Sequence, residues 1–105
     1  MDKKATIKLV EAFGSKVIPE LPIDGVWLYG SWAYGIPDED SDIDVAVTLS
    51  DTSLDLMDTE RTLFRLRRSI DRRIEPIVIY PGEDRSGFSD MILEKGIRIY
   101  PASTI

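Results

Sequence analysis

Apolar residues recur along the chain at two different spacings, which together predict helices interleaved with strands. Near the start, Leu9, Val10 and Phe13 fall on one side of a helix that we expect from about Lys3 to Phe13. Gly14 follows directly, and a glycine after the last periodic position is a common helix end, so we expect the helix to stop there.

A longer apolar stripe predicts a second helix that ends near Arg72. Asp51, Thr52 and Ser53 are candidate N-caps for it. Acidic residues come early in this stretch and basic residues late, an order that complements the helix dipole. The apolar positions that we expect this helix to bury are Leu56, Met57, Leu63, Phe64, Leu66 and Ile70.

Four shorter apolar runs have the length and composition of β-strands, at residues 26–29, 42–49, 74–80 and 97–100. Asp42, Asp44 and Ala46 alternate with β-branched residues in the second run, so the two sets should occupy opposite faces of the strand. A short helix is expected at 88–94. Strands that alternate with helices predict an α+β (α/β-like) fold, a mixed sheet flanked by helices, and the 105 residues fit a single domain spanning 1–105.

The composition narrows the chemistry that this domain can perform. The net charge of −6 argues against direct, non-specific nucleic-acid binding, but it permits a nucleotide ligand because bound magnesium can reverse the local sign of charge. Cysteine and histidine are both absent, which excludes disulfides, thiolate nucleophiles, histidine bases and the usual zinc sites. The sequence shows no leader and no bilayer-spanning run, so we expect a cytoplasmic protein without membrane contact.

The most informative stretch joins Gly30 and Ser31 to Asp42 and Asp44. A glycine–serine turn ahead of a helix favours phosphate, because free amides and the helix dipole attract an anion. Two aspartates two positions apart on a strand lie about 6.6 Å apart at their Cα atoms, and can share a cation or hold two ions. For an isolated pair, the alternative is a solvated face or one covered by an arginine.

Glu75 is the best candidate for a third carboxylate, near the start of the strand at 74–80. A strand-borne acid beside a metal pair could take a proton from an attacking hydroxyl. The alternative is a surface acid that is paired with Arg72 or Arg73.

The motif formed by Gly30, Ser31, Ala33, Gly35, Ser41, Asp42 and Asp44 resembles the G-S-x-A-x-G…S-D-x-D pattern of the DNA polymerase beta-like nucleotidyltransferase superfamily. The short chain is similar to its minimal, antitoxin-type (MNT) members. The resemblance implies the nucleotidyltransferase fold, ATP bound with its phosphates at Gly30 and Ser31, and two Mg²⁺ ions at Asp42 and Asp44 with Glu75 as third acid. It also implies transfer of a nucleoside monophosphate with loss of pyrophosphate.

Two departures from the family pattern are visible. Tyr34 stands where many relatives carry an arginine, so a basic phosphate contact would have to come from elsewhere, with Lys16, Arg72 and Arg73 as candidates. The third acid is glutamate where the superfamily often has aspartate.

The resemblance also implies a partner, because minimal relatives commonly accompany a HEPN-domain ribonuclease toxin and some adenylylate it. The chain is therefore expected to be the antitoxin of such a pair, transferring AMP to a hydroxyl of the toxin, within a homo- or hetero-oligomer. One alternative is a non-catalytic module that masks its partner through exposed Trp32, Tyr34 and Phe88. Another is a transferase that acts on a small molecule such as an aminoglycoside.

Overall fold

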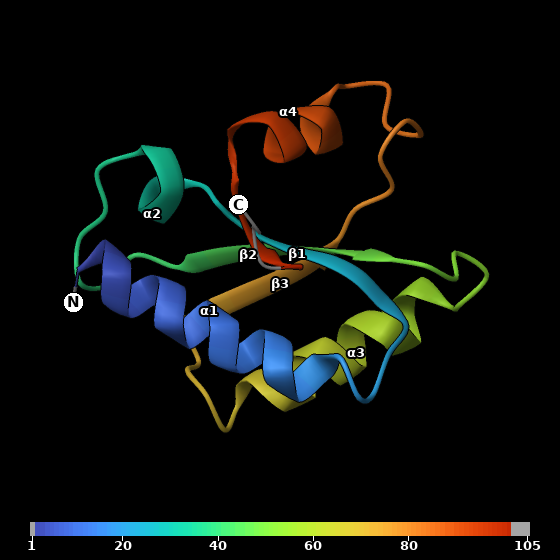
Figure 1. Cartoon of the computed structure of the whole chain (residues 1–105), viewed down its shortest axis with the longest axis horizontal. Helices are drawn as coiled ribbons and strands as arrows, with labels where there is room; N and C mark the ends of the chain where they lie inside the picture. Colours follow the sequence, from blue (N-terminus) through green and yellow to red (C-terminus); the bar gives the residue numbers. More distant parts are fainter. Residues whose placement is uncertain (1, 102–105) are drawn as a thin grey trace.

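The computed structural model describes residues 2–101 as a four-stranded sheet with helices on both faces (Figure 1). The elements in chain order are α1 (Lys3–Val17), β1 (Ile23–Tyr29), α2 (Ser31–Tyr34), β2 (Ile43–Leu49), α3 (Leu56–Arg67), β3 (Ile74–Val78), α4 (Phe88–Lys95) and β4 (Ile97–Tyr100). No helix in this part of the chain is both long and apolar enough to cross a bilayer.

The sheet is mixed, as the alternation of elements predicts. Its strand order is β3-β2-β1-β4, with β1 antiparallel to both β2 and β4. Strands β2 and β3 run parallel, so the chain between them must cross over, and α3 makes that connection. Strand β2 therefore lies between β1 and β3, and its side chains have a neighbour on each side.

The two faces of the sheet are covered unequally. Helices α1 and α3 pack under one face, whereas α2 and α4 lie above the other (Figure 1). The larger core, beneath the sheet, is built from α1, α3 and alternate strand positions, with Phe13, Val45 and Leu63 fully buried. The cluster under α4 is small, with Ala46, Ile79 and Ile92 as its buried members. The strand faces expected for residues 42–49 are confirmed, since Ile43, Val45 and Val47 join one cluster and Ala46 joins the other.

Helix α1 continues through Gly14, so the expected end there is wrong. Gly14 is buried, and a Cβ at this position would lie 4.0 Å from Val26 Cγ2, so the helix approaches β1 closely at this point. Val17 extends the buried stripe four residues beyond Phe13. The stripe therefore outweighs the low helix propensity of glycine, and the helix ends just before Pro19.

Helix α3 is shorter at both ends than the sequence predicts. Its N-cap is Asp55, whose carboxylate accepts a hydrogen bond from the Asp58 amide at 2.9 Å. Asp51 does not cap the helix, because its carboxylate accepts hydrogen bonds from the amide and the hydroxyl of Ser53 in a separate turn. The residues of the expected stripe are buried to different degrees. Leu63 is buried, Leu66 and Ile70 pack against the core, Phe64 is half-buried, and Leu56 and Met57 are exposed.

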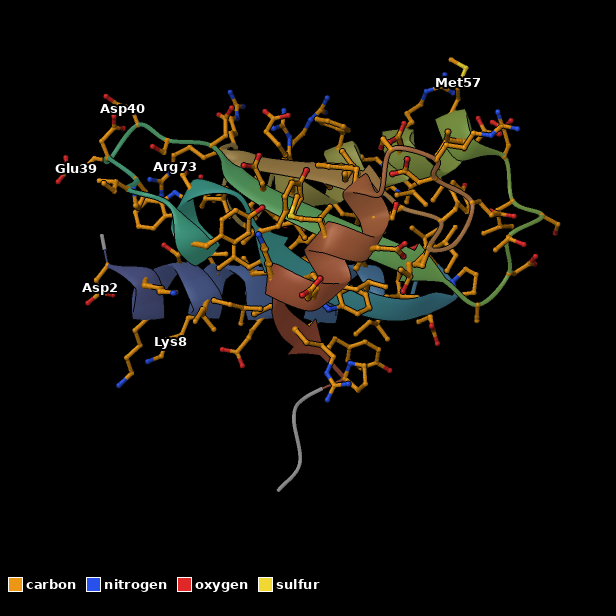
Figure 2. The ribbon with its side chains drawn as sticks, turned by 90° about the horizontal axis from the view of Figure 1, so that it is seen from above. Asp2, Lys8, Glu39, Asp40, Met57 and Arg73 are labelled. Atoms are coloured by element: carbon orange, nitrogen blue, oxygen red, sulfur yellow. The ribbon has the colours of Figure 1, made fainter. Side chains whose placement is uncertain are left out.

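The exposure of Met57 has a simple cause. The first turn of α3 extends past the end of the sheet, and Figure 2 shows the Met57 side chain pointing away from the molecule. The remaining strands and α4 agree with expectation to within about three residues at each end, which is the usual uncertainty of boundaries predicted from sequence.

Candidate active site

Strand pairing brings three polar side chains together above the sheet. Asp44 of β2 is directly opposite Glu75 in the parallel ladder with β3, and directly opposite Tyr29 in the antiparallel ladder with β1. Residues paired across a ladder project to the same face. Ala46, two positions after Asp44, belongs to the cluster under α4, so all three side chains lie on the face that α2 and α4 cover.

Gly30 forms the turn between β1 and α2, and its conformation requires glycine. Its φ is 74° and its ψ is −151°, a region that residues with a side chain essentially never occupy. A Cβ at this position would also collide with the carboxylate of Asp44. The glycine–serine turn and the aspartate strand are therefore in direct contact, which joins the two halves of the sequence motif into one site.

The short helix α2 starts immediately after this turn. The carbonyl of Gly30 accepts hydrogen bonds from the amides of Ala33 and Tyr34, at 3.0 and 3.1 Å. The amides of Ser31 and Trp32 belong to the first turn and have no preceding turn to donate to. Ser31 is half-buried at this corner. The start of α2 thus presents backbone donors beside the Asp44 carboxylate.

Asp42, Asp44 and Glu75 place several negative charges close together at the site. Burial raises the pKa of Asp44 above its ordinary value, and the nearby charges of Asp42 and Glu75 raise it further. Burial, followed by the charge of Asp44, raises the pKa of Tyr29 to about 12. A bound cation would relieve this repulsion. Because the donors are all oxygen atoms, the donor chemistry fits magnesium or manganese.

The three acids differ in their exposure, and Asp44, like Glu75, is half-buried. Asp42 precedes the first residue of β2 and is exposed, whereas Glu75 is half-buried. Within residues 2–101, no group of three or more acidic side chains is arranged closely enough to hold one metal ion. The three acids share a face, and the charges of Asp42 and Glu75 raise the pKa of Asp44. Their role as a metal site remains a prediction.

Glu75 has a basic neighbour, but it is not one of the expected arginines. Its Oε1 lies 3.5 Å from Nη1 of Arg67, at the limit of a hydrogen bond. The same Nη1 makes shorter bonds to the carbonyls of Arg72 and Ile74, at 2.7 and 2.8 Å. Arg67 therefore primarily holds the turn that leads into β3. Nothing in the sequence singles it out, because the turn that brings α3 back to β3 creates this contact.

Arg73 organises the loop that precedes Asp42. Its guanidinium donates to the Asp71 carboxylate at 2.7 and 3.0 Å and to the Glu39 carbonyl at 2.9 Å. Figure 2 shows Arg73 beside Glu39 and Asp40. Its own carbonyl accepts from the amide of Ile43 at 2.8 Å. Arg73, a candidate phosphate contact, therefore already forms hydrogen bonds with Asp71 and Glu39.

The other expected cations lie at the surface, whereas a lysine that was not expected contacts α2. Lys16 and Arg72 are exposed. Lys3, at the start of α1, donates from Nζ to the carbonyl of Ala33 at 2.8 Å and so reaches the end of α2. Its proximity depends on how α1 packs beside α2, which spacing along the chain does not reveal.

Trp32 corrects one of the sequence interpretations. Only 5% of its surface is exposed, and its Nε1 donates to the Ser41 carbonyl at 3.4 Å. It packs into the larger core and cannot form part of an exposed aromatic surface. Tyr34 and Phe88 are exposed as expected, at 48% and 40%.

The sheet order, the glycine turn, the aspartate on β2 and the acid on β3 place this chain in the class of nucleotidyltransferase-fold domains. The family model described as "Polymerase beta, Nucleotidyltransferase" matches residues 15–105. The chain therefore belongs to that family.

Solved structures agree with this assignment at the level of the fold. A protein from Sulfolobus solfataricus described as a "putative nucleotidyltransferase" is 19% identical with a TM-score of 0.66, covering 91% of this chain and 80% of that one. A toxin–antitoxin complex with AMP-PNP is 19% identical with a TM-score of 0.57, covering 98% and 76%. A form of the toxin–antitoxin MntA–HpeT with two aspartates replaced by glutamate is 18% identical with a TM-score of 0.52, again covering 98% and 76%. None of the curated proteins matches this chain.

Proposed function

We propose that this protein is a magnesium-dependent nucleotidyltransferase that transfers AMP from ATP to a hydroxyl group of a partner protein. The observation that carries the proposal is the contact of the Gly30 turn with Asp44, which is paired in register with Glu75. A phosphate-binding turn and carboxylates at one end of a sheet are what transfer to an oxygen nucleophile needs, in a chain that has no histidine or cysteine.

Each residue has a role in this proposal. The backbone at Gly30 and Ser31 would hold the triphosphate, and Asp42 and Asp44 would hold magnesium. Bound there, magnesium would offset the negative charge of the triphosphate and stabilise the attacking and leaving oxygens. Glu75 would accept the proton of the attacking hydroxyl. The hydroxyl oxygen bonds to the α-phosphorus, the bond from that phosphorus to the bridging oxygen breaks, and pyrophosphate leaves.

The partner that we propose is a toxin of the HEPN class, with this chain as its antitoxin. Similarity to two toxin–antitoxin structures over 98% of the chain supports a toxin partner, and AMP-PNP in one of those structures supports an ATP-class nucleotide. Exposed Tyr34, Ile36 and Phe88 also favour a second candidate function, in which the protein neutralises its partner by covering it.

The experiment uses the full chain, magnesium and, as the candidate toxin, the protein encoded by the adjacent reading frame. With ATP labelled at the α-phosphate we expect label on the toxin, and with ATP labelled at the γ-phosphate we expect none. Asp42→Asn and Asp44→Asn should abolish labelling. Asp40→Asn, an exposed acid in the same loop, is the matched control and should keep it. A toxin that stays unlabelled yet is still neutralised would reject transfer and favour masking.

A further inference from the structure

Four side chains from β1, α2 and α4 form an apolar surface above the sheet, which we call the aromatic wall: Tyr29, Tyr34, Phe88 and Met91. The hydroxyl of Tyr34, the last residue of α2, donates to the sulfur of Met91 on α4 at 3.4 Å. The rings of Tyr29 on β1 and Phe88 on α4 pack edge to face, with their centroids 5.9 Å apart. Phe88 and Met91 are three residues apart on α4, so they are neighbours on its surface. Helices α2 and α4, which lie above the same face of the sheet, therefore build this wall together (Figure 1).

The aromatic wall lies close to both parts of the candidate active site. Tyr29 is directly opposite Asp44 in the ladder between β1 and β2, and the ring of Phe88 packs on Tyr29. Tyr34 is three residues after Ser31 on α2, a spacing that makes the two residues neighbours on the helix surface. A ligand whose phosphate groups lie at the glycine–serine turn would therefore have its remaining atoms within reach of the wall.

Two rings of the aromatic wall are open to solvent. Tyr34 is 48% exposed and Phe88 is 40% exposed, whereas Tyr29 and Met91 are half-buried. The contacts with Met91 and Tyr29 hold the two exposed rings in position before a ligand arrives. The hydroxyl hydrogen of Tyr34 already points to a sulfur atom and phenylalanine has no polar side-chain atom, so neither exposed ring offers a free hydrogen-bond donor. The wall therefore presents aromatic surface to a ligand rather than hydrogen bonds.

We propose that the aromatic wall binds the base of the nucleotide, which stacks on the exposed ring of Tyr34 beside Phe88. This inference rests on the proposed function, which places the triphosphate at the neighbouring turn. Stacking on an aromatic side chain uses the flat face that every base has, and base preference then follows from stacking strength. Because the exposed rings have no free donor with which to read the edge of a base, the larger ring system of a purine binds better than a pyrimidine. The ligand class is a purine nucleoside triphosphate.

Other ligands fit the aromatic wall less well. A phosphate group or another anion would lie beside Asp44 and would find no positive charge among the four side chains of the wall. A divalent metal ion needs several oxygen ligands that converge, whereas the wall contributes only two phenol groups. A partner protein that covered Tyr34 and Phe88 would also cover Ile36, which is 99% exposed and lies outside the wall. Replacement of Ile36 therefore separates partner binding from base binding.

The test is a calorimetric titration of the full chain in magnesium with ATP, CTP and methyl triphosphate, which has the same phosphates as ATP but no base. We expect ATP to bind at least about fivefold more tightly than methyl triphosphate, since stacking of one base on one aromatic side chain accounts for at least that factor. CTP should bind with intermediate affinity. The H2 and H8 resonances of adenine should move upfield on binding, because the current of a stacked ring shields these protons.

Variants locate the base. Tyr34→Leu should bind ATP no more tightly than methyl triphosphate, and its unchanged affinity for methyl triphosphate shows that the variant is folded. Tyr34→Phe keeps the ring and should bind ATP like the wild type, as should the control Ile36→Ala. Phe88→Leu is a second variant of the wall and should also weaken ATP binding.

Two results overturn the proposal: equal affinity of the wild type for ATP and methyl triphosphate, or wild-type ATP affinity in both Tyr34→Leu and Phe88→Leu. In either case, magnesium-dependent binding of methyl triphosphate would leave the proposed function intact. If neither ATP nor methyl triphosphate bound to the wild type, the proposed function and this inference would both be rejected.

Discussion

Replacing Asp44 with asparagine is expected to abolish nucleotidyl transfer and to raise the thermal stability of the magnesium-free protein. Activity should fall by at least about 100-fold, since even outer partners of a metal site cost about 10–100-fold when they are removed. Stability should rise because burial and the charges of Asp42 and Glu75 oppose ionisation of Asp44, whose pKa is raised. Asparagine has a similar shape and removes the charge. The measurements are incorporation of α-labelled ATP and Tm in EDTA.

The pH dependence of this effect has a definite sign. An acid whose pKa is raised in the folded state destabilises the fold while it is ionised. For Asp44 that penalty is complete above the raised pKa and is lost below the ordinary value of 3.8, where both folded and unfolded forms are protonated. The Tm advantage of Asp44→Asn should therefore shrink as the pH falls. It should also shrink at neutral pH when magnesium is added.

Asp71 provides a control of opposite sign. The side-chain hydrogen bond from Arg73 holds the pKa of Asp71 below its usual value, so its ionised form stabilises the fold above the unfolded pKa. Asp71→Asn should lower Tm at neutral pH, and that loss should fade as the solution becomes acidic. If both variants shifted Tm in the same direction, the account of charge at the Asp44 site would be wrong.

Gly30→Ala is expected to damage both the fold and the site. The backbone conformation at φ 74° and ψ −151° costs a residue with a side chain about 1–3 kcal/mol. The added methyl group would also collide with the Asp44 carboxylate, so that the carboxylate must leave its position beside the turn. We expect the free energy of unfolding in urea to fall by at least that amount. Transfer activity should be lost even at temperatures where the variant is fully folded.

Gly82→Ala is the matched control for this prediction. Gly82 also has a positive φ, of 84°, but a Cβ there would meet nothing within 4 Å. This variant should show only the cost of the backbone conformation and should retain transfer activity. Equal activity loss in the two glycine variants would contradict a specific contact between the Gly30 turn and Asp44.

The sequence predicts the order of the elements better than their ends. The buried stripes of α1 and the faces of β2 follow from spacing, because burial of apolar residues decides them. The end of α1 does not follow from spacing. Gly14 has a low helix propensity, but the helix continues through it because it lies where the helix approaches β1. The start of α3 likewise depends on which of several acids, Asp51 or Asp55, actually caps the helix.

The candidate site also has some features that the sequence predicts and others that it does not. The placement of Gly30, Asp44 and Glu75 near one another can be predicted, because they come at the ends of strands that pair in a mixed sheet. The contacts of Arg67 and Lys3 could not be predicted, because they depend on how helices pack. The burial of Trp32 was missed because a four-residue helix has too few positions to show a periodic pattern.

The central claim is that Asp42 and Asp44 bind a nucleotide together with magnesium. The most direct test is calorimetric titration of ATP into the wild-type protein and into Asp42→Asn, each with magnesium and with EDTA. We expect wild type to bind ATP much more tightly with magnesium than in EDTA, and Asp42→Asn to lose that difference while its fold is unchanged. Equal ATP affinity of wild type with and without magnesium, or a magnesium effect that persists in Asp42→Asn, would contradict the claim.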